Sequence, residues 1–352
     1  IYSTFPLELG GYASLSGTSM ASPHVAGGAA LMLQYNPQLR ASDMDGRLQN
    51  TADPKTWWGN PALGFLDNVH RQGAGMLNLV NAVLNRSSVE PSDLSLGESQ
   101  AGPAVRTLTI RNRSGGPVTY DVSHVPALAT GANTFTPSFF AAFATTTFSA
   151  PSVTVPAHGS ATVDVTITAP AALPDHGIYG GYVVLTPPSG SVATTMRVPY
   201  AGFKGDYQSI QVLTPTTNGF PWLAKLANGT FTNQPNGASF TMTGDDIAFF
   251  LVHLDHQSAR LKIEAFDAVT GKNVGKVSDD KLLPRNSTAT GFFEFAWDGT
   301  TFRGNGANPN QIKTVPNGQY YVKLSLLKAL GDDDNPADFE TWTSPVFTIA
   351  RP

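Results

Sequence analysis

The chain has 352 residues and a net charge of −4, with 22 Lys plus Arg against 26 Asp plus Glu. This balance gives no basic footprint for nucleic acid, and no run of about 20 apolar residues could span a membrane. The lack of cysteine excludes disulfides, thiolate zinc sites and a cysteine nucleophile. The 34 glycines and 26 prolines exceed the usual shares of about 7% and 5%, which favours short strands and many turns.

The first 87 residues are expected to be helical and rich in loops. Residues 21–35 are mostly apolar, with many alanines and glycines, and Asn36-Pro37 follows them, so the pattern predicts a buried helix. A second helix is predicted from residue 42 to residue 51. A third is expected over residues 76–84, after a glycine-rich turn.

From about residue 88 the pattern changes to alternating apolar and polar residues with frequent turns. Residues 106–111 and 162–168 alternate cleanly, and residues 181–186 and 192–198 flank a Pro-Pro-Ser-Gly turn, which predicts a hairpin. These strands predict a β-sandwich. A second β-unit begins after it, and its clearest strands are expected at residues 247–254, 261–266, 292–297 and 320–326.

One segment carries residues suited to chemistry, and it reads Gly17-Thr18-Ser19-Met20-Ala21-Ser22-Pro23-His24-Val25-Ala26-Gly27. It places a serine where a glycine-containing loop enters a helix. The helix N-terminus offers free backbone N–H groups and a partial positive charge, which suit a nucleophile whose attack creates an oxyanion. Pro23 is expected in the first helical turn, where its missing N–H is least harmful. The segment is not the Gly-x-Ser-x-Gly elbow, because Ala21 occupies the last position.

These eleven residues resemble the nucleophile signature of subtilisin-like serine proteases at every position. Residues 71–78 resemble the Gly-x-Gly segment that opens a late helix of the same domain. Residues 198–207 resemble the end of the fibronectin-III-like domain of the cell-envelope branch, which includes C5a peptidases and lactocepins. All three segments stand in the order of the family.

The resemblance implies a multidomain fold, in which a piece of an α/β domain is followed by two all-β sandwiches. Residues 1–87 would be the C-terminal part of an α/β subtilisin-like peptidase domain. Residues 88–206 would be a fibronectin-III-like β-sandwich, and residues 207–352 a second accessory sandwich of fibronectin-III-like or immunoglobulin-like type. Because the chain begins with Ile1 and no signal-like segment follows, we expect a processed or truncated piece of a longer protein.

The resemblance also implies a role for each residue of the motif. Ser19 would be the nucleophile, and its own backbone N–H would be one oxyanion donor. The residues beside the scissile bond would be Leu15, Ser16 and Thr18. Packing roles within the motif would fall to Gly17, Pro23, His24 and Gly27.

The catalytic partners of Ser19 are not expected in this chain. Family members carry an Asp, a His and an oxyanion Asn far N-terminal to the serine, whereas residues 1–18 contain neither Asp nor His. His24 lies five residues after Ser19, about 140° around the helix, and should not face it. The other histidines of the β-units, among them His124 and His253, are expected on surfaces or in loops. The chain alone is therefore expected to be inactive.

The function expected from the sequence is that of the C-terminal portion of a secreted serine endopeptidase. It would cleave protein or peptide substrates through an acyl-enzyme, together with an N-terminal segment that carries the Asp, His and Asn. The resemblance implies no organic cofactor, and no residues are assigned to a metal site, although a structural cation is left open. The expected location is extracellular or cell-wall-associated. Two alternatives stay open: a non-catalytic adhesion or cell-wall-binding module, and a dead homologue of the family.

Four Asn-x-Ser/Thr sequons are possible glycosylation sites, a number no greater than chance predicts. They matter only in a eukaryotic secretory pathway. They lie at Asn85, Asn112, Asn228 and Asn286.

Overall fold

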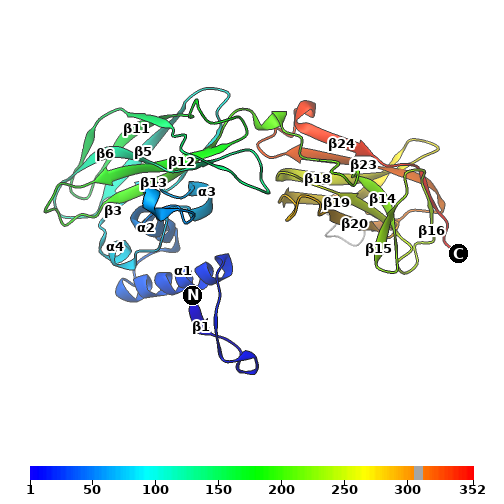
Figure 1. The fold of residues 1–352 in the computed structure, drawn as a ribbon, viewed down its shortest axis with the longest axis horizontal. Coiled ribbons are helices and arrows are strands. Elements are labelled where there is room, and N and C mark those ends of the chain that lie inside the picture. The colour runs from blue at the N-terminus through cyan, green and yellow to red at the C-terminus, as the bar shows by residue number, and fades with distance from the viewer. Residues whose placement is uncertain (305–311) are drawn as a thin grey trace. The chain divides into compact units, whose positions relative to one another are not determined.

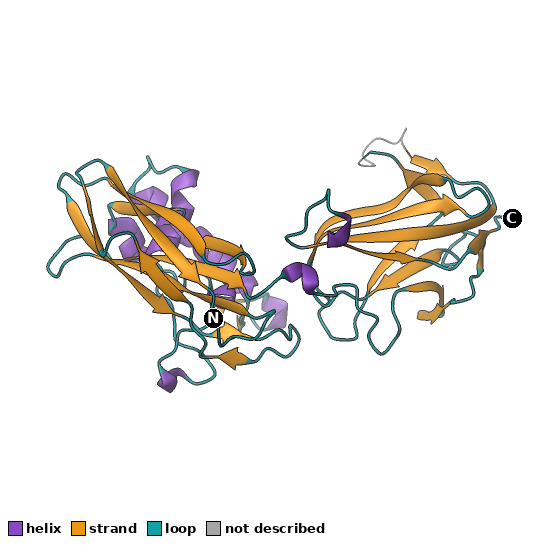
Figure 2. Ribbon diagram, turned by 90° about the horizontal axis from the view of Figure 1, so that it is seen from above, coloured by secondary structure: helices purple, strands orange, loops and turns teal. Residues whose placement is uncertain are grey.

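The computed structural model shows a chain that is mostly β-structure (Figures 1 and 2). It describes residues 1–304 and 312–352, and the α-helices of these residues all lie before residue 85. Contacts between Cα atoms group residues 1–132 and 138–205 into one compact unit. The second unit consists of residues 206–352 together with the short segment 133–137.

The first unit begins with a hairpin and a long helix. The hairpin consists of β1 (Tyr2–Thr4) and β2 (Tyr12–Ser14) around the 3-10 turn η1 (Leu7–Leu9), and helix α1 (Thr18–Tyr35) follows. The short helices after it are η2 (Ala41–Asp43), α2 (Met44–Thr51), η3 (Pro61–Leu63), α3 (Val69–Gln72) and α4 (Leu79–Leu84).

The helices predicted over residues 21–35 and 42–51 are confirmed, but the third begins three residues later than predicted. Asn78 is its N-cap, and the backbone N–H of Asn81 donates to Asn78 Oδ1 at 3.0 Å. This side-chain bond satisfies one of the N–H groups that a helix start leaves without a partner.

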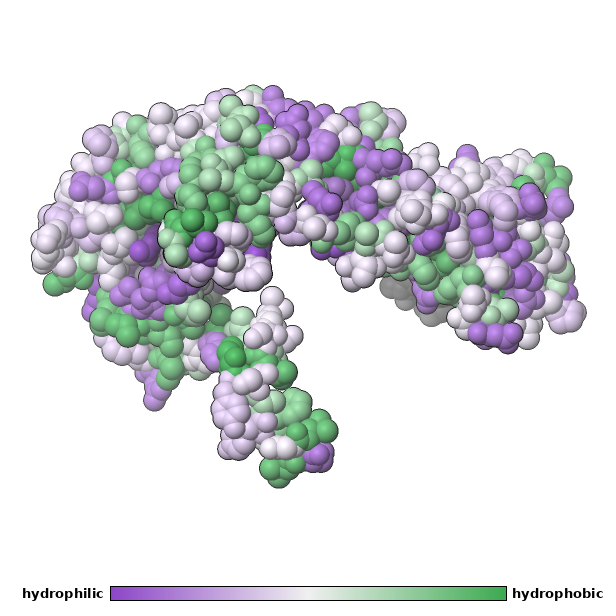
Figure 3. Space-filling model, viewed as in Figure 1, coloured by the Kyte–Doolittle hydropathy of each residue, from purple (hydrophilic) through white to green (hydrophobic). Residues whose placement is uncertain are grey.

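Helix α1 is in place, but the prediction that it is buried is wrong. Between Thr18 and Tyr35 only Gly28 and Met32 are buried, whereas Leu31 is 54% exposed and Leu33 41% exposed. Figure 3 shows apolar residues on the surface of this helix and of the preceding hairpin. A helix that is apolar nearly all round requires partners on several faces, and the described residues cover only one stripe of it.

Residues 87–203 form two sheets that share one core. One sheet has the order β3-β5-β11-β9, and the other β10-β6-β12-β13-β4 with β7 and β8 beside it. The bounds are β3 (Ser87–Glu90), β4 (Leu94–Glu98), β5 (Ala104–Asn112), β6 (Val118–Pro126), β7 (Ala129–Thr130), β8 (Phe139–Phe140), β9 (Thr145–Phe148), β10 (Ser152–Val155), β11 (Ser160–Thr168), β12 (Ile178–Thr186) and β13 (Met196–Phe203).

The core of this sandwich follows from the alternation in its strands. Leu108 and Val163 point inward from one sheet, and Val183 and Met196 from the other. Strands β12 and β13 pair antiparallel, which confirms the predicted hairpin, and β4 joins β13 in parallel.

Strand β12 is buried on both faces, because the helical segment packs on its outer side. Val183 and Leu185 enter the sandwich core, while Tyr182 and Val184 contact Val69 of α3. The Tyr182 hydroxyl donates to the Gly73 carbonyl at 2.9 Å. The segment around α2 and α3 is therefore fixed to the sandwich, and the two belong to one compact unit.

The described residues of the second unit also form two sheets, with orders β15-β14-β17-β20 and β16-β25-β23-β18-β19-β21-β22, where β24 pairs with β23. The four strands predicted from the sequence are confirmed. The elements are η4 (Tyr207–Ser209), β14 (Trp222–Ala227), β15 (Thr230–Asn233), β16 (Ser239–Phe240), β17 (Ala248–Val252), β18 (Ser258–Asp267), β19 (Asn273–Leu283), β20 (Phe293–Trp297), β21 (Thr300–Phe302), β22 (Ile312–Thr314), β23 (Gly318–Lys328), η6 (Pro336–Asp338), β24 (Phe339–Thr343) and β25 (Phe347–Ile349).

Candidate active site

Ser19 is the second residue of helix α1, directly after its glycine N-cap. Gly17 has a φ of 142°, a conformation that favours glycine, and its carbonyl accepts the N–H groups of Met20 and Ala21 at 3.0 and 3.2 Å. The N–H of Ser19 lies before these first helical bonds. Among the described residues neither this N–H nor the Ser19 hydroxyl has a hydrogen-bond partner. The site therefore offers an exposed hydroxyl next to a free backbone donor.

The segment that leads into this turn is extended and exposed. The N-terminal amine of Ile1 donates to the Leu15 carbonyl at 2.9 Å, and the Leu15 N–H donates to the Ile1 carbonyl at 2.9 Å. Leu15, Ser16 and Thr18 are all exposed. Their place beside a scissile bond stays a prediction. Their exposure is compatible with it.

Pro23 does not lie in the first turn, so that prediction is wrong. The helix starts at Thr18 rather than at Ala21, which places Pro23 in its second turn. Because Pro lacks an N–H, the carbonyl of Ser19 has no i+4 donor at this position. The proline therefore loosens the helical bonding at the candidate nucleophile itself.

His24 bonds within its own helix. Its Nδ1 lies 2.7 Å from the carbonyl oxygen of Met20, to which it donates. Among the described residues no histidine forms a hydrogen bond to Ser19, in agreement with the expectation that His24 faces away from it. His24 and Gly27 are exposed, and a Cβ added at Gly27 would meet no atom within 4 Å. Their packing role stays a prediction.

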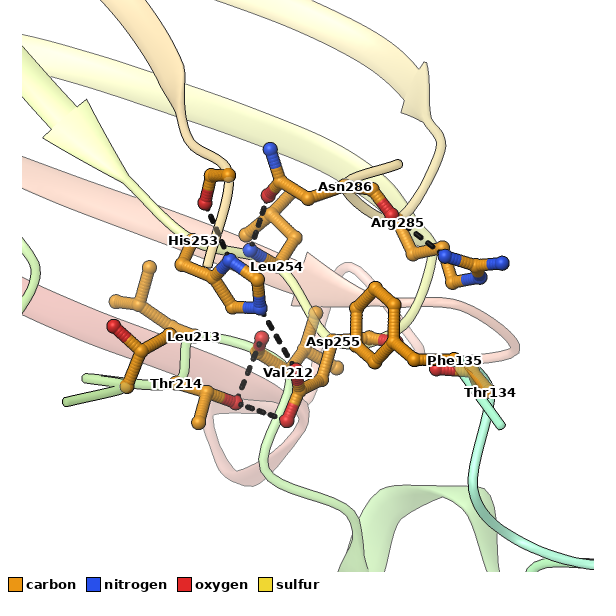
Figure 4. A network of polar contacts seen from close by, with 12 residues as sticks. Thr134, Phe135, Val212, Leu213, Thr214, His253, Leu254, Asp255, Arg285 and Asn286 are labelled. Atoms are coloured by element: carbon orange, nitrogen blue, oxygen red, sulfur yellow. Dashed lines mark hydrogen bonds and ion pairs between the residues drawn. The ribbon is translucent and has the colours of Figure 1, made fainter. Parts of the chain in front are cut away.

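A histidine paired with an aspartate occurs in the second unit (Figure 4). His253 Nε2 lies 2.8 Å from Asp255 Oδ1, and the Thr214 hydroxyl donates to Asp255 Oδ2 at 3.0 Å. His253 Nδ1 lies 2.5 Å from the Gly291 carbonyl oxygen. A catalytic triad needs a ring nitrogen that faces the hydroxyl. Here both nitrogens are engaged and the hydroxyl bonds the carboxylate, so the cluster is structural.

His253 lies in the loop after β17, as one part of the expectation had it, but it does not lie on the surface, because its side chain is fully buried. The ring of Phe135 lies 5.8 Å from the imidazole, and the guanidinium of Arg285 lies 4.6 Å above Phe135. The Thr134 hydroxyl donates to the Asp255 carbonyl at 2.9 Å. This cluster explains why the short segment 133–137 belongs to the second unit.

Three of the four sequons are buried, which argues against glycans on them in the folded chain. Asn85, Asn112 and Asn286 are 2%, 2% and 4% exposed. The Asn112 amide donates to the Gly116 carbonyl at 2.8 Å, and Asn286 accepts the N–H of Leu254 at 2.7 Å. Asn228 is exposed in a turn and is the remaining candidate.

The titration of His124 should make the first unit less stable in acid. Burial lowers the pKa of His124, whose Nε2 lies 2.7 Å from the Tyr200 hydroxyl. Below pH 6.5 the unfolded chain takes up the proton more readily than the folded chain, so stability falls with falling pH. We expect a smaller free energy of unfolding at pH 5 than at pH 7.5, measured by hydrogen exchange of β6 and β12.

A matched pair of variants checks this assignment. His124→Gln should reduce the loss between pH 7.5 and pH 5, since an amide does not titrate. His158→Gln, at an exposed position, should leave the loss unchanged. An unchanged pH dependence in His124→Gln would assign the effect to other groups.

Comparison with known proteins identifies the class of the N-terminal segment. Residues 3–76 match the Subtilase family model, and residues 94–201 match the model of an Fn3-like domain. The chain thus contains a subtilase segment followed by an Fn3-like domain.

The relatives are subtilisin-like proteinases. The chain is 24% identical over 388 residues to a PII-type proteinase of Lactococcus lactis subsp. cremoris, which covers 92% of this chain and 20% of that protein. Subtilisin DY of Bacillus licheniformis is 58% identical over 52 residues (15% of this chain, 18% of the relative). The minor extracellular protease Vpr of Bacillus subtilis (strain 168) is 34% identical over 108 residues (30% and 13%). The chain spans about a fifth or less of the length of these relatives. Among the described residues, no helix has the length and apolar character needed to cross a membrane.

Proposed function

We propose that this chain is the C-terminal portion of a secreted, subtilisin-like serine endopeptidase in which Ser19 is the nucleophile. The observation that carries the proposal is the place of Ser19 at the start of α1, with an exposed hydroxyl and an unpartnered backbone N–H. Both lie inside the segment that matches the subtilase family. An extracellular location agrees with the name of one relative, the minor extracellular protease Vpr.

The proposed reaction is an acyl transfer. Ser19 Oγ forms a bond to the carbonyl carbon of the scissile peptide, and its proton passes to a histidine base. The carbonyl oxygen becomes an oxyanion, which the N–H of Ser19 and an Asn side chain stabilise. The amine leaves with the proton from the histidine, and water then hydrolyses the acyl-enzyme. The histidine, its aspartate and the Asn would come from an N-terminal segment.

The exposed face of α1 is where this N-terminal segment would pack. Val25 is 45% exposed and Leu31 54%, although folding normally buries Val and Leu, and Tyr35 is 64% exposed. The hairpin before α1 exposes further apolar side chains, including Leu7 at 89%. An apolar surface of this kind marks an interaction site, and the candidate nucleophile lies where the hairpin and the helix that carry it meet.

A fluorophosphonate probe, which reacts with activated serines, tests the proposal. We expect no labelling of the 352-residue chain alone, and labelling at Ser19 in the natural protein that contains it. Intact mass and the N-terminal sequence of that protein would show whether the Asp, His and Asn lie on the same polypeptide or on a second one. Absence of labelling in the natural protein would indicate a dead homologue, and labelling of the chain alone would show that it holds its own base.

A further inference from the structure

The large sheet of the second unit has an outward face that is charged and aromatic. Along β18 the side chains of Leu261 and Ile263 are fully buried in the core. The residues that alternate with them, Arg260, Lys262 and Glu264, point to the other face. These outward-facing residues line a groove.

The groove has a volume of about 450 Å³. Its charged lining residues are Arg260, Lys262, Lys276, Arg303 and Glu264. Four of these are cationic and one is anionic, on a protein whose net charge is −4. Arg303 is exposed, and among the described residues no carboxylate pairs with it. The groove therefore carries a local positive excess that the rest of the chain does not share.

The cations are held in place by carboxylates on the same face of the sheet, where Asp279 pairs in register with Lys262. Arg260 donates from Nε and from one terminal nitrogen to the two oxygens of Asp279, at 2.7 and 2.9 Å, and Lys276 Nζ lies 2.6 Å from the same carboxylate. Hydrogen bonds from Arg260, and next from Lys276, hold the pKa of Asp279 well below its usual value. The carboxylate of Asp279 thus holds two cations, and the three groups together keep a net charge of one positive unit. Asp333 acts on Arg260 only through a weaker charge interaction.

Lys262 and Asn273 are held in a similar way, by the carboxylate of Glu264. Lys262 Nζ lies 3.1 Å from Glu264, and the Asn273 amide donates to Glu264 at 3.0 Å. Only 19% of the Lys276 side chain and 32% of the Lys262 side chain is exposed. Partial burial strengthens the attraction of these ammonium groups for an anion relative to fully solvated lysines.

An aromatic pair adjoins the groove on the same face. Phe266 pairs in register with Asn273 of the groove on one side and with Tyr321 on the other. The rings of Phe266 and Tyr321 stack with centroids 5.3 Å apart and an angle of 9° between their planes. The ammonium of Lys323 lies 5.0 Å above Phe266. Half-buried rings beside hydrogen-bonding amides offer the apolar faces of sugar rings a surface to pack on.

We propose that this face binds an anionic polysaccharide. The acidic groups of the polymer would bind Lys262, Lys276 and Arg303, while its sugar rings pack beside Phe266 and Tyr321. Charge complementarity selects the anion, and the row of outward side chains across neighbouring strands suits an extended polymer. The site lies in the second unit and is independent of the proposed chemistry at Ser19.

The experiment measures binding of polygalacturonate to the 352-residue chain by isothermal titration calorimetry. Dextran, a neutral polysaccharide, and poly-glutamate, an anionic polymer without sugars, are the comparison polymers. We expect binding of polygalacturonate that weakens as salt is raised, and weaker or no binding of the other two. The double variant Lys262→Gln/Arg303→Gln should weaken polygalacturonate binding about tenfold.

The control is Lys55→Gln/Arg86→Gln, which removes the same charge from exposed positions in the first unit. It should bind as the unmodified chain does, and both double variants should retain the unmodified circular dichroism spectrum and melting temperature. No binding of polygalacturonate, or an equal loss in both double variants, would overturn the proposal. Poly-glutamate binding as tight as polygalacturonate binding would overturn its polysaccharide part.

Discussion

Replacing Ser19 with alanine in the longer endopeptidase proposed above is expected to lower kcat for a peptide substrate by about 10⁶-fold. In the proposed mechanism the oxygen of this hydroxyl forms the acyl-enzyme, so its loss removes the covalent route and leaves only what the oxyanion donors and substrate binding provide. The rate acceleration that remains is about 10³–10⁴-fold over the reaction in water. KM should change little, because Ser19 contributes almost nothing to ground-state binding in this mechanism. Steady-state kinetics with a chromogenic peptide measure both constants.

The control for this variant is Ser189→Ala, an exposed serine in the loop between β12 and β13. It should retain full kcat and KM, and both variants should have the same melting temperature as the unmodified protein. If Ser19→Ala retained more than about a hundredth of the original kcat, the hydroxyl would not be the nucleophile, and another group of the protein would have to be sought.

The place of Ser19 at the start of a helix could be predicted from the sequence because its signal is local. Glycine at residue 17, serine at 19 and the helix after them lie within one stretch of chain, and helix geometry relates them. The burial of His253 is the opposite case, because it depends on residues remote in sequence. His253 follows Val252 at the end of an apolar strand, where a polar residue usually marks the surface. Its burial depends on Gly291 and Phe135, which lie 38 and 118 residues away.

Burial in the fold is harder to predict than the elements themselves. Strand β12 has apolar residues at successive positions, a pattern that predicts a strand but does not say what covers its second face. The structure supplies the answer, since Val69 and α3 pack there. Helix α1 is the opposite case. Its apolar sequence predicts that several of its faces are buried, whereas the described residues cover only one face. Both cases depend on partners remote in sequence.

Replacing Asn50 with alanine is expected to lower the free energy of unfolding of the first unit by about 3 kcal/mol. Asn50 lies in α2 and is fully buried. Its Oδ1 accepts the N–H of Val89 in β3 at 2.8 Å, and its Nδ2 donates to the Arg197 carbonyl in β13 at 3.3 Å. Alanine would leave both groups without this partner, each at a desolvation penalty of about 1–3 kcal/mol. The side chain thus joins the subtilase segment to both sheets of the sandwich.

The measurement is native-state hydrogen exchange, which separates the first unit from the second. Asn50→Ala should speed exchange at Val89 and throughout α2, whereas strands β18 and β23 of the second unit should exchange as before. Asn60→Ala is the matched control, because Asn60 is exposed and makes no cap bond with its side chain, and it should change stability by less than about 0.5 kcal/mol. Equal effects of the two variants would show that the bonds of Asn50 add no measurable stability, and that the packing around Val69 and the bond from the Tyr182 hydroxyl to the Gly73 carbonyl hold the segment instead. The position of α1, and of Ser19 with it, would then not depend on the hydrogen bonds of the Asn50 side chain.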